Sequence, residues 1–165
     1  MQVRTATIDD AFAIEQIRVR GWRSAYRHVF PPEELDRMTV DESRWRLRFR
    51  EPPSGWTVLV ATRDDDAVAG FAALGPSRDG GRLGELYAIY VDPDDWSTGA
   101  GTALIVRTEE LLADVYDEAI LWVLEENPRA RRFYEGAGWT ADGGRQMFER
   151  FGVRAPEVRY RKALA

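Results

Sequence analysis

Leu83-Gly-Glu-Leu-Tyr-Ala-Ile-Tyr-Val91, Asp92-Pro-Asp-Asp-Trp-Ser-Thr98 and Gly99-Ala-Gly-Thr-Ala-Leu-Ile105 follow one another without a break in this chain. The pattern predicts a strand, a glycine-containing turn and the start of a helix. The first N–H groups of a helix have no partner within it, so they can hold an anion such as a phosphate. Glycine lets a ligand approach the backbone closely. Taken alone, the stretch also fits a glycine-rich turn that binds nothing.

Three known ligand-binding patterns do not match this turn. A P-loop needs a lysine after its second glycine, and no such lysine follows Gly101. A dinucleotide fingerprint needs a small residue where Leu104 stands, and Trp96 and Ser97 lie where a calcium loop needs a ligand and a glycine. What remains is the geometry of a helix N-terminus, with N–H groups from about Thr98 to Thr102 available to a pyrophosphate.

A second motif, Asn127-Pro-Arg-Ala-Arg-Arg-Phe-Tyr134, follows an apolar strand predicted over residues 119–124. Proline at its first turn is typical of a helix start. The seven-residue spacing places the Asn127 amide and the Tyr134 phenol two helical turns apart on one face. This predicts a proton donor beside a phosphate-bearing cofactor. The alternative for Tyr134 is a core residue that anchors the helix.

The composition favours one globular domain over residues 1–165. The chain is 44% hydrophobic with six Trp, six Tyr and seven Phe, and that length can bury a core. The absence of cysteine excludes disulfides and cysteine-based zinc sites, and we expect no metal. A net charge of −5 gives nucleic-acid binding no support. No membrane span or signal peptide is recognisable, so we expect a cytoplasmic protein without a membrane partner.

Hydrophobic periodicity and turn residues predict a mixed order of helices and strands. We expect helices over residues 7–27, with Thr7 as the N-cap, and over 32–49, 101–116 and 128–135. We expect strands over residues 3–7, 56–62, 67–74, 82–91, 119–124, 146–151 and 157–164. The strand over 82–91 is apolar on both faces in its second half, which is typical of a central strand.

These motifs together resemble the GNAT N-acetyltransferase superfamily over about residues 3–163. Tyr90-Val-Asp-Pro93 followed by the turn at Gly99 looks like its pyrophosphate motif. The stretch 121–127 followed by 130–139 looks like its second acetyl-CoA motif, and both termini are also similar. The resemblance implies an α/β fold, with a central, mixed, mostly antiparallel twisted sheet of about seven strands flanked by about four helices. A splay is expected between the fourth and fifth strands.

The resemblance implies acetyl-CoA as the acetyl donor. Pantetheine would lie along the backbone of Ile89 and Val91 and bind the Asn127 amide, and the Val91 N–H could polarise the acetyl carbonyl. The pyrophosphate would meet the turn, formed by Thr98, Gly99, Ala100, Gly101 and Thr102.

The turn departs from the family pattern. Trp96 and Thr98 stand where the family usually has a polar or basic side chain, and Asp94 and Asp95 add negative charge. We therefore expect Arg131 or Arg132 to reach a CoA phosphate.

By the same resemblance, acetyl passes directly to a primary amine of a small molecule or a peptide. Tyr134 is the expected general acid. Glu85 is the candidate general base, and its alternative role is an ion pair with Arg82 or another arginine. Weaker acceptor-binding candidates are Trp22, Tyr26 and Phe30.

Two further points stay open at the level of the sequence. The same fold could hold an acyl-CoA as a sensor without turnover, because the turn is atypical. Homodimer formation is common in the family, and no residue here decides it.

Overall fold

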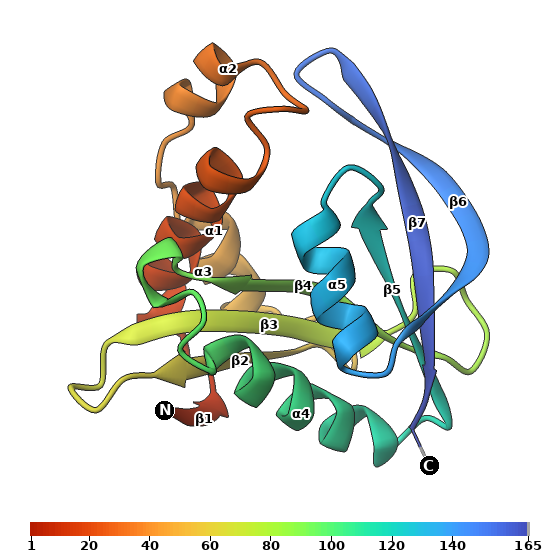
Figure 1. The fold of residues 1–165 in the computed structure, drawn as a ribbon. Helices are drawn as coiled ribbons and strands as arrows, with labels where there is room; N and C mark the ends of the chain where they lie inside the picture. Colours follow the sequence, from red (N-terminus) through yellow and green to blue (C-terminus); the bar gives the residue numbers. More distant parts are fainter. Residues whose placement is uncertain (165) are drawn as a thin grey trace.

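The computed structural model describes residues 1–164, and Figure 1 shows a single open sheet with helices packed on both sides. The strands lie in the order β1-β2-β3-β4-β5-β7-β6. Their bounds are β1 Gln2–Thr5, β2 Thr57–Thr62, β3 Val68–Pro76, β4 Gly84–Val91, β5 Glu118–Leu124, β6 Thr140–Arg150 and β7 Val153–Ala163. The helices are α1 Ala11–Ala25, α2 Pro32–Arg37, α3 Ser43–Arg50, α4 Ala100–Ala113 and α5 Pro128–Gly136, with short 3-10 turns at Ile8–Asp10 and Pro93–Asp95. The predicted GNAT-like fold class is confirmed.

Both faces of the sheet are covered, which explains the nearly continuous apolar strands. Successive residues of β2 point to opposite faces, and both sets are buried. Leu59 packs in the cluster that holds α4 and α5, whereas Val58 and Val60 pack in the cluster that holds α1. A third cluster joins the end of α1 and α2 to the β6–β7 hairpin.

The sheet splits between its two parallel strands. Pairing of β4 with β5 extends only from Gly84–Leu86 to Ala119–Leu121, and every other strand pair is antiparallel. The opposite edge of β5 remains paired with β7 along its whole length. Figure 1 shows α5 beside the C-terminal end of β5, next to this opening. The predicted splay between the fourth and fifth strands is therefore confirmed, and it creates the site described below.

One predicted helix is two helices in the structure. The range 32–49 divides into α2 and α3, and Met38 between them has an extended backbone, with φ −57° and ψ 133°. The Asp41 carboxylate accepts a hydrogen bond from the Ser43 N–H at 3.0 Å. Such local side-chain bonds compete with helical ones and restart the chain at a new helix.

The β6–β7 hairpin is longer than predicted, and its turn lies where a strand was expected. Phe151 and Gly152 both have positive φ, 54° and 73°, as a tight hairpin turn requires. Phenylalanine seldom adopts that backbone, so the sequence pattern favoured a strand through Phe151. The register of β6 against β7 shifts between Ala141 and Arg145, where Gly143 and Gly144 lie. Because glycines are rare inside strands, the sequence pattern did not predict the first half of β6.

Candidate functional site

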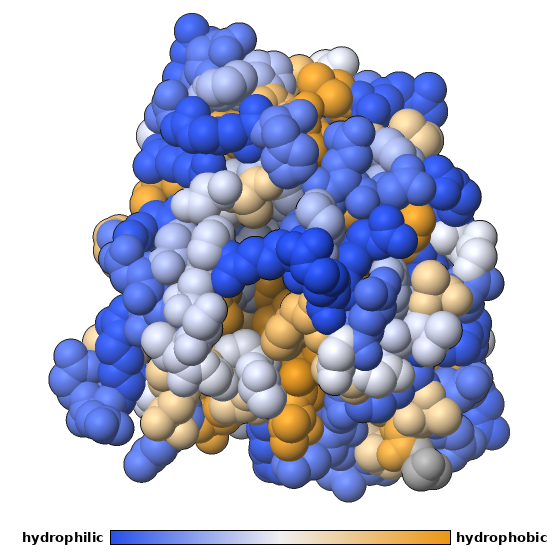
Figure 2. Space-filling view, viewed as in Figure 1, coloured by the Kyte–Doolittle hydropathy of each residue, from blue (hydrophilic) through white to orange (hydrophobic). Residues whose placement is uncertain are grey.

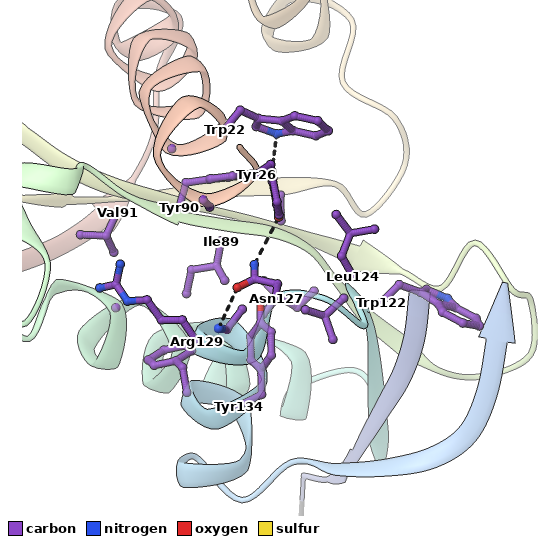
Figure 3. A pocket seen from close by; sticks show the side chains of 18 of the residues that line it. Trp22, Tyr26, Ile89, Tyr90, Val91, Trp122, Leu124, Asn127, Arg129 and Tyr134 are labelled. Atoms are coloured by element: carbon purple, nitrogen blue, oxygen red, sulfur yellow. Dashed lines mark hydrogen bonds between the residues drawn. The ribbon is translucent and has the colours of Figure 1, made fainter. Parts of the chain in front are cut away.

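A cleft of about 560 Å³ opens where β4 and β5 separate. Its walls come from α1, β4, the turn before α4, β5, α5 and the β6–β7 hairpin. Figure 2 shows an apolar floor in this hollow, with strongly hydrophilic side chains crossing above it. Figure 3 shows the side chains that converge on it from α1, β4, β5 and α5. The cleft thus brings together the glycine turn and the second motif, although Ile105 at the end of the first stretch and Asn127 at the start of the second are 22 positions apart in the sequence.

The glycine turn forms one end of the cleft. Gly99 has φ 94°, which allows the chain to reverse into α4. A Cβ on Gly101 would lie 3.3 Å from the Phe133 ring, so even a methyl group at this position would press against that ring. Gly99, Gly101 and Thr102 line the cleft, whereas Ala100 is buried beneath it.

Thr98 closes the turn instead of lining the cleft. Its N–H and its hydroxyl both donate to the Asp95 carbonyl, at 3.3 and 2.6 Å. The Thr98 N–H is therefore engaged within the turn, and the role of Thr98 in binding the cofactor stays a prediction.

The acidic residues around the turn are neutralised by arginines from elsewhere in the chain. Arg20 of α1 contacts Asp92 at 2.6 Å and Asp94 at 2.8 Å, and its guanidinium holds the pKa of Asp94 below the usual range. Arg63, just after β2, pairs with Asp95. The negative charge expected to oppose an anion at this turn is therefore offset within the fold.

A basic side chain that the sequence reasoning missed lies across the cleft. The Arg129 guanidinium stacks on the Trp96 ring, 3.4 Å from its centroid, and both residues line the cleft. The Trp96 indole N–H donates to the Val91 carbonyl at 3.0 Å, which fixes the ring at the end of β4. Figure 3 shows Arg129 reaching from α5 towards Val91.

The two arginines predicted for this role do not line the cleft. Arg131 donates to the Tyr160 hydroxyl at 3.1 Å, and Arg132 lines a second hollow between α4 and α5. Helical spacing was the signal that could have found Arg129, because it lies four residues before Phe133, which faces the cleft.

Tyr134 lies at the centre of the cleft wall. The residue is 7% exposed, lines the cleft, and packs its ring against Phe133 and Tyr160. No group among residues 1–164 hydrogen-bonds to its hydroxyl. Burial raises the pKa of Tyr134 above the ordinary tyrosine value, so the phenol keeps its proton at neutral pH.

Asn127 lies just before α5 as its N-cap. Its Oδ1 accepts from the Ala130 N–H at 3.1 Å, and its Nδ2 donates to the Tyr26 hydroxyl at 3.4 Å. The side chain thus starts α5 and ties it to α1, and it also lines the cleft. The structure brings Asn127 and Tyr134 to the same cavity, as the spacing predicted.

Ile89 and Val91 line the cleft from the part of β4 that β5 no longer pairs with. The edge of β4 facing the opening therefore has no neighbouring strand. Backbone groups on such an edge can bind an extended ligand, although the Val91 carbonyl already accepts from the Trp96 indole.

The other end of the cleft is aromatic. Trp22 and Tyr26 of α1 line it, together with Tyr90 and Phe148, and the Trp22 indole donates to the Tyr90 hydroxyl at 2.8 Å. Phe30, the third predicted acceptor residue, does not line the cleft. It is 2% exposed and stacks behind Trp22 at 5.4 Å.

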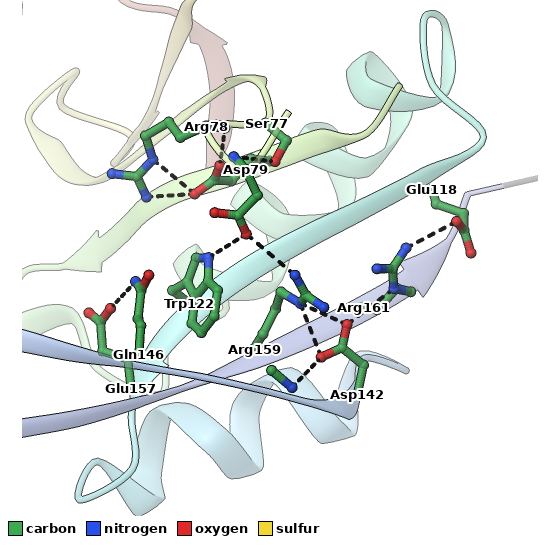
Figure 4. A network of polar contacts seen from close by, with 12 residues as sticks. Ser77, Arg78, Asp79, Glu118, Trp122, Asp142, Gln146, Glu157, Arg159 and Arg161 are labelled. Carbon is green, nitrogen blue, oxygen red and sulfur yellow. Dashed lines mark hydrogen bonds and ion pairs between the residues drawn. The ribbon is translucent and has the colours of Figure 1, made fainter. Parts of the chain in front are cut away.

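Glu85 is fully buried and does not line the cleft. Its carboxylate accepts from the Arg78 N–H at 2.8 Å and from the Arg78 guanidinium at 2.5 and 3.0 Å (Figure 4). The partner is therefore Arg78, not Arg82, and it is Arg78 that reaches the cleft. These contacts favour the ion-pair alternative for Glu85, and its role as a base stays a prediction.

Two polar residues on the hairpin were also missed. Gln146 of β6 and Glu157 of β7 both line the cleft and hydrogen-bond to each other at 2.6 Å (Figure 4). Both lie in ranges predicted as strands, but only the pairing of the hairpin shows which face they occupy.

Two kinds of feature are absent from residues 1–164. No cluster of three or more His, Asp or Glu side chains is arranged to hold a metal ion. No helix in the same range has the length and apolar character to cross a membrane.

Comparison with known proteins gives the family and the fold. Residues 15–139 match the model of the Acetyltransferase (GNAT) family. An uncharacterized N-acetyltransferase of Bacillus subtilis is 34% identical over 161 residues, covering 94% of this chain and 89% of that protein. A mycothiol acetyltransferase of Kineococcus radiotolerans is 37% identical over 107 residues, 65% of this chain but only 34% of that longer protein.

Two solved structures share the fold along nearly the whole chain. A putative acetyltransferase of Salmonella typhimurium, solved with acetyl-CoA, superposes with a TM-score of 0.78 at 20% identity and covers 100% of this chain and 94% of that one. A phosphinothricin acetyltransferase of Sinorhizobium meliloti, in complex with acetyl-CoA, gives 0.77 at 20% identity, with 99% and 88% covered.

Proposed function

Because this chain belongs to the GNAT acetyltransferase family and is an acyltransferase, we propose that it moves the acetyl group of acetyl-CoA directly to a primary amine. One observation carries the proposal. The cleft at the β4–β5 splay joins a helix N-terminus, an unpaired strand edge and the buried phenol of Tyr134. These three features suit a phosphate, an amide-containing arm and a leaving thiolate, in that order along one cavity.

The donor substrate would lie with its diphosphate at the glycine turn. The N–H groups of Gly99, Gly101 and Thr102 and the positive end of the α4 dipole favour an anion there. Arg129 supplies the basic side chain that the turn itself lacks. The pantetheine arm would bind the open edge of β4 at Ile89 and Val91.

The transfer requires one bond to form and one to break. The neutral amine attacks the acetyl carbonyl, the C–N bond forms, and collapse of the adduct breaks the C–S bond. Tyr134 gives its proton to the departing sulfur, and the amine nitrogen returns a proton to Tyr134 as it becomes an amide. The Val91 N–H is the candidate donor to the carbonyl oxygen in the transition state.

Glu85 remains a candidate for removing the first ammonium proton, but its carboxylate is buried and paired with Arg78. The carboxylate would have to release the Arg78 guanidinium and gain access to the cleft first. A pH–rate profile of Glu85→Gln that keeps the wild-type shape would assign Glu85 to holding Arg78 in place.

The acceptor of this chain is not given by its relatives. The proteins named mycothiol acetyltransferases match this chain over only part of their length. In the protein from Kineococcus radiotolerans the matched part is 34% of the whole. A small-molecule amine and a peptide amine both remain within the proposal. Apart from Glu85, the residues named for the transfer line one cleft of a single chain.

The proposal is tested by measuring thiol release from acetyl-CoA across a panel of amines, with mass spectrometry of the acetylated product. We expect release that depends on the amine and an amide product. Binding of acetyl-CoA without release for any amine would instead favour the sensor alternative. Failure to bind acetyl-CoA at millimolar concentration in calorimetry would overturn both.

A further inference from the structure

Glu157 is a carboxylate in the cleft that forms no ion pair with any residue of the range 1–164. It lies on β7 opposite Leu124, the last residue of β5, and therefore at the open end of the splay. Its side chain accepts a hydrogen bond from the Gln146 amide at 2.6 Å. Within residues 1–164, no Lys or Arg side chain lies within 4.0 Å of its carboxylate.

Three neighbouring arginines are paired with other acids, whereas Arg150 of β6 forms no ion pair within residues 1–164 and lies over the Trp22 ring, 5.1 Å from its centroid. Arg78 is held by Glu85, Arg145 by Glu125, and Arg159 by Asp79 and Asp142. Figure 4 shows Arg159 with Asp79 and Asp142, and Arg78 with its carboxylate partner, beside the Gln146–Glu157 contact. Asp95, the other acid that lines the cleft, is paired with Arg63. Among the described residues, Glu157 is therefore the one acidic group lining the cleft that forms no ion pair within 4.0 Å. It acts on the Arg78 guanidinium only at longer range, as one of the charges that raise the pKa of Arg78, while Glu85 holds that guanidinium directly.

A half-buried carboxylate without a counter-ion is stabilised by a cation that enters from solution. The walls around it favour the same kind of ligand. Trp22, Tyr26 and Phe148 line this end of the cleft and offer apolar contact to the body of a ligand. The Trp22 ring itself is already in contact with Phe30, which stacks on it, and with the Arg150 guanidinium. Phe148 lies two residues from Gln146 on the same face of β6, so amide, carboxylate and ring share one wall.

We propose that Glu157, held in position by Gln146, binds the ammonium group of the acceptor, and that the acceptor is a cationic primary amine with an apolar or aromatic body. The body packs against Trp22, Tyr26 and Phe148 while the nitrogen lies at the carboxylate. The acceptor identification rests on the proposed function, because the site is assigned to the substrate of acetyl transfer. The cation site itself does not, because it can be occupied without turnover.

The first experiment measures binding of benzyltrimethylammonium, a cation with an aromatic body that cannot be acetylated. Calorimetric titration of the wild-type protein is compared with Glu157→Gln and with the charge-conserving Glu157→Asp. The matched control is Glu125→Gln, which removes the same charge from the exposed pair with Arg145. We expect Glu157→Gln to weaken binding by about tenfold or more, Glu157→Asp to restore part of it, and Glu125→Gln to leave it unchanged.

The second experiment measures turnover with two nucleophiles, phenethylamine and hydroxylamine, at a mildly alkaline pH where hydroxylamine is uncharged. In Glu157→Gln we expect the KM for phenethylamine to rise about tenfold, with the KM for acetyl-CoA and the rate with hydroxylamine unchanged. An unchanged acetyl-CoA KM also shows that the variant is folded.

Equal affinity of wild type and Glu157→Gln for benzyltrimethylammonium would overturn the cation site, even if acetyl transfer is observed. Equal loss of phenethylamine and hydroxylamine turnover would overturn it as well, since it would mean general damage to the cleft. If the binding difference is found while no amine is acetylated, the cation site stands and the proposed function fails.

Discussion

The two ends of the cleft are built on different principles. The backbone groups of the donor end come from one continuous stretch, the end of β4 and the first turn of α4. The acceptor end is made of side chains from α1, β4, β6 and β7, which are far apart in the sequence. The first can therefore be recognised in the sequence by its glycines, and the second appears only when the fold has brought its parts together.

The two ends also differ in charge. At the donor end the acids of the turn are paired with Arg20 and Arg63, and Arg129 contributes a positive group. At the acceptor end Arg78 is neutralised by Glu85, and Glu157 contributes a negative group. One cavity thus presents an anion-binding end and a cation-binding end, with Tyr134 in its wall. The predictions below test whether the ends behave independently.

Tyr134→Phe is expected to have the largest effect, because the reaction of both substrates depends on this proton. We expect kcat to fall about a hundredfold or more, with the Kd for acetyl-CoA nearly unchanged. Steady-state kinetics and calorimetry check this. A variant that keeps its kcat would reduce Tyr134 to a packing role and leave the two ends without a shared acid.

The pH dependence offers a check on the same residue. Burial raises the pKa of Tyr134 above 10, the ordinary value. The folded protein therefore keeps this proton where the unfolded chain loses it, and the free energy of unfolding should fall as pH rises above about 10. Between pH 7 and about 9 the residue contributes no change. Denaturant titrations of wild type and Tyr134→Phe would show the difference, and an equal alkaline loss in both would contradict it.

Gly101→Val is expected to affect only the donor end. The new side chain would meet the Phe133 ring and fill the space in front of the helix N-terminus. We expect acetyl-CoA to bind about 30-fold more weakly, or ~2 kcal/mol, with binding of benzyltrimethylammonium unchanged. Gly136→Val, at the open end of α5, is the matched control. Parallel loss of both ligands in Gly101→Val would mean that the ends are coupled.

Arg129→Met should have a smaller effect at the same end. It removes the guanidinium while keeping an apolar stem against Trp96, and Arg129 is exposed, so solvent screens its charge. We expect about fivefold weaker binding of acetyl-CoA, and none of this loss with acetyl-pantetheine, which lacks the diphosphate. Arg132→Met is the control, because Arg132 does not line the cleft. A similar loss in the control would restore the role predicted for Arg132.

Glu85→Gln is expected to change the chemistry least. The carboxylate is buried under Arg78 and does not line the cleft, so kcat should change by less than about threefold, with an unchanged pH profile. The substitution should lower the stability of the fold, because Arg78 loses its charged partner. Thermal unfolding measures this loss of stability. A large loss of kcat, with an altered pH profile, would instead make Glu85 the base.

Much of the fold and of the donor end could be predicted from the sequence. The apolar strands, the glycine turn and the Asn127–Tyr134 spacing are local patterns, and the structure places Asn127 and Tyr134 in one cavity. The divided helix at Met38 and the turn at Phe151 were missed because a local hydrogen bond and an unusual positive φ overrode the hydrophobic pattern.

The predictions about individual charges were the weakest, for a physical reason. Arg129 and Arg131 are two residues apart, and only the phase of α5 decides which faces the cleft. The neutralisation of Asp92 by Arg20 joins residues 72 positions apart, and the placement of Glu157 depends on the β5–β7 register. Such long-range contacts leave no local pattern in a single sequence.

The most direct test of two independent ends is a crossed titration of acetyl-CoA and benzyltrimethylammonium against wild type, Arg129→Met and Glu157→Gln. The account predicts that Arg129→Met weakens only acetyl-CoA and that Glu157→Gln weakens only the cation, by about fivefold and about tenfold respectively. If each variant weakens both ligands alike, or neither, the division of the cleft into an anion end and a cation end is wrong.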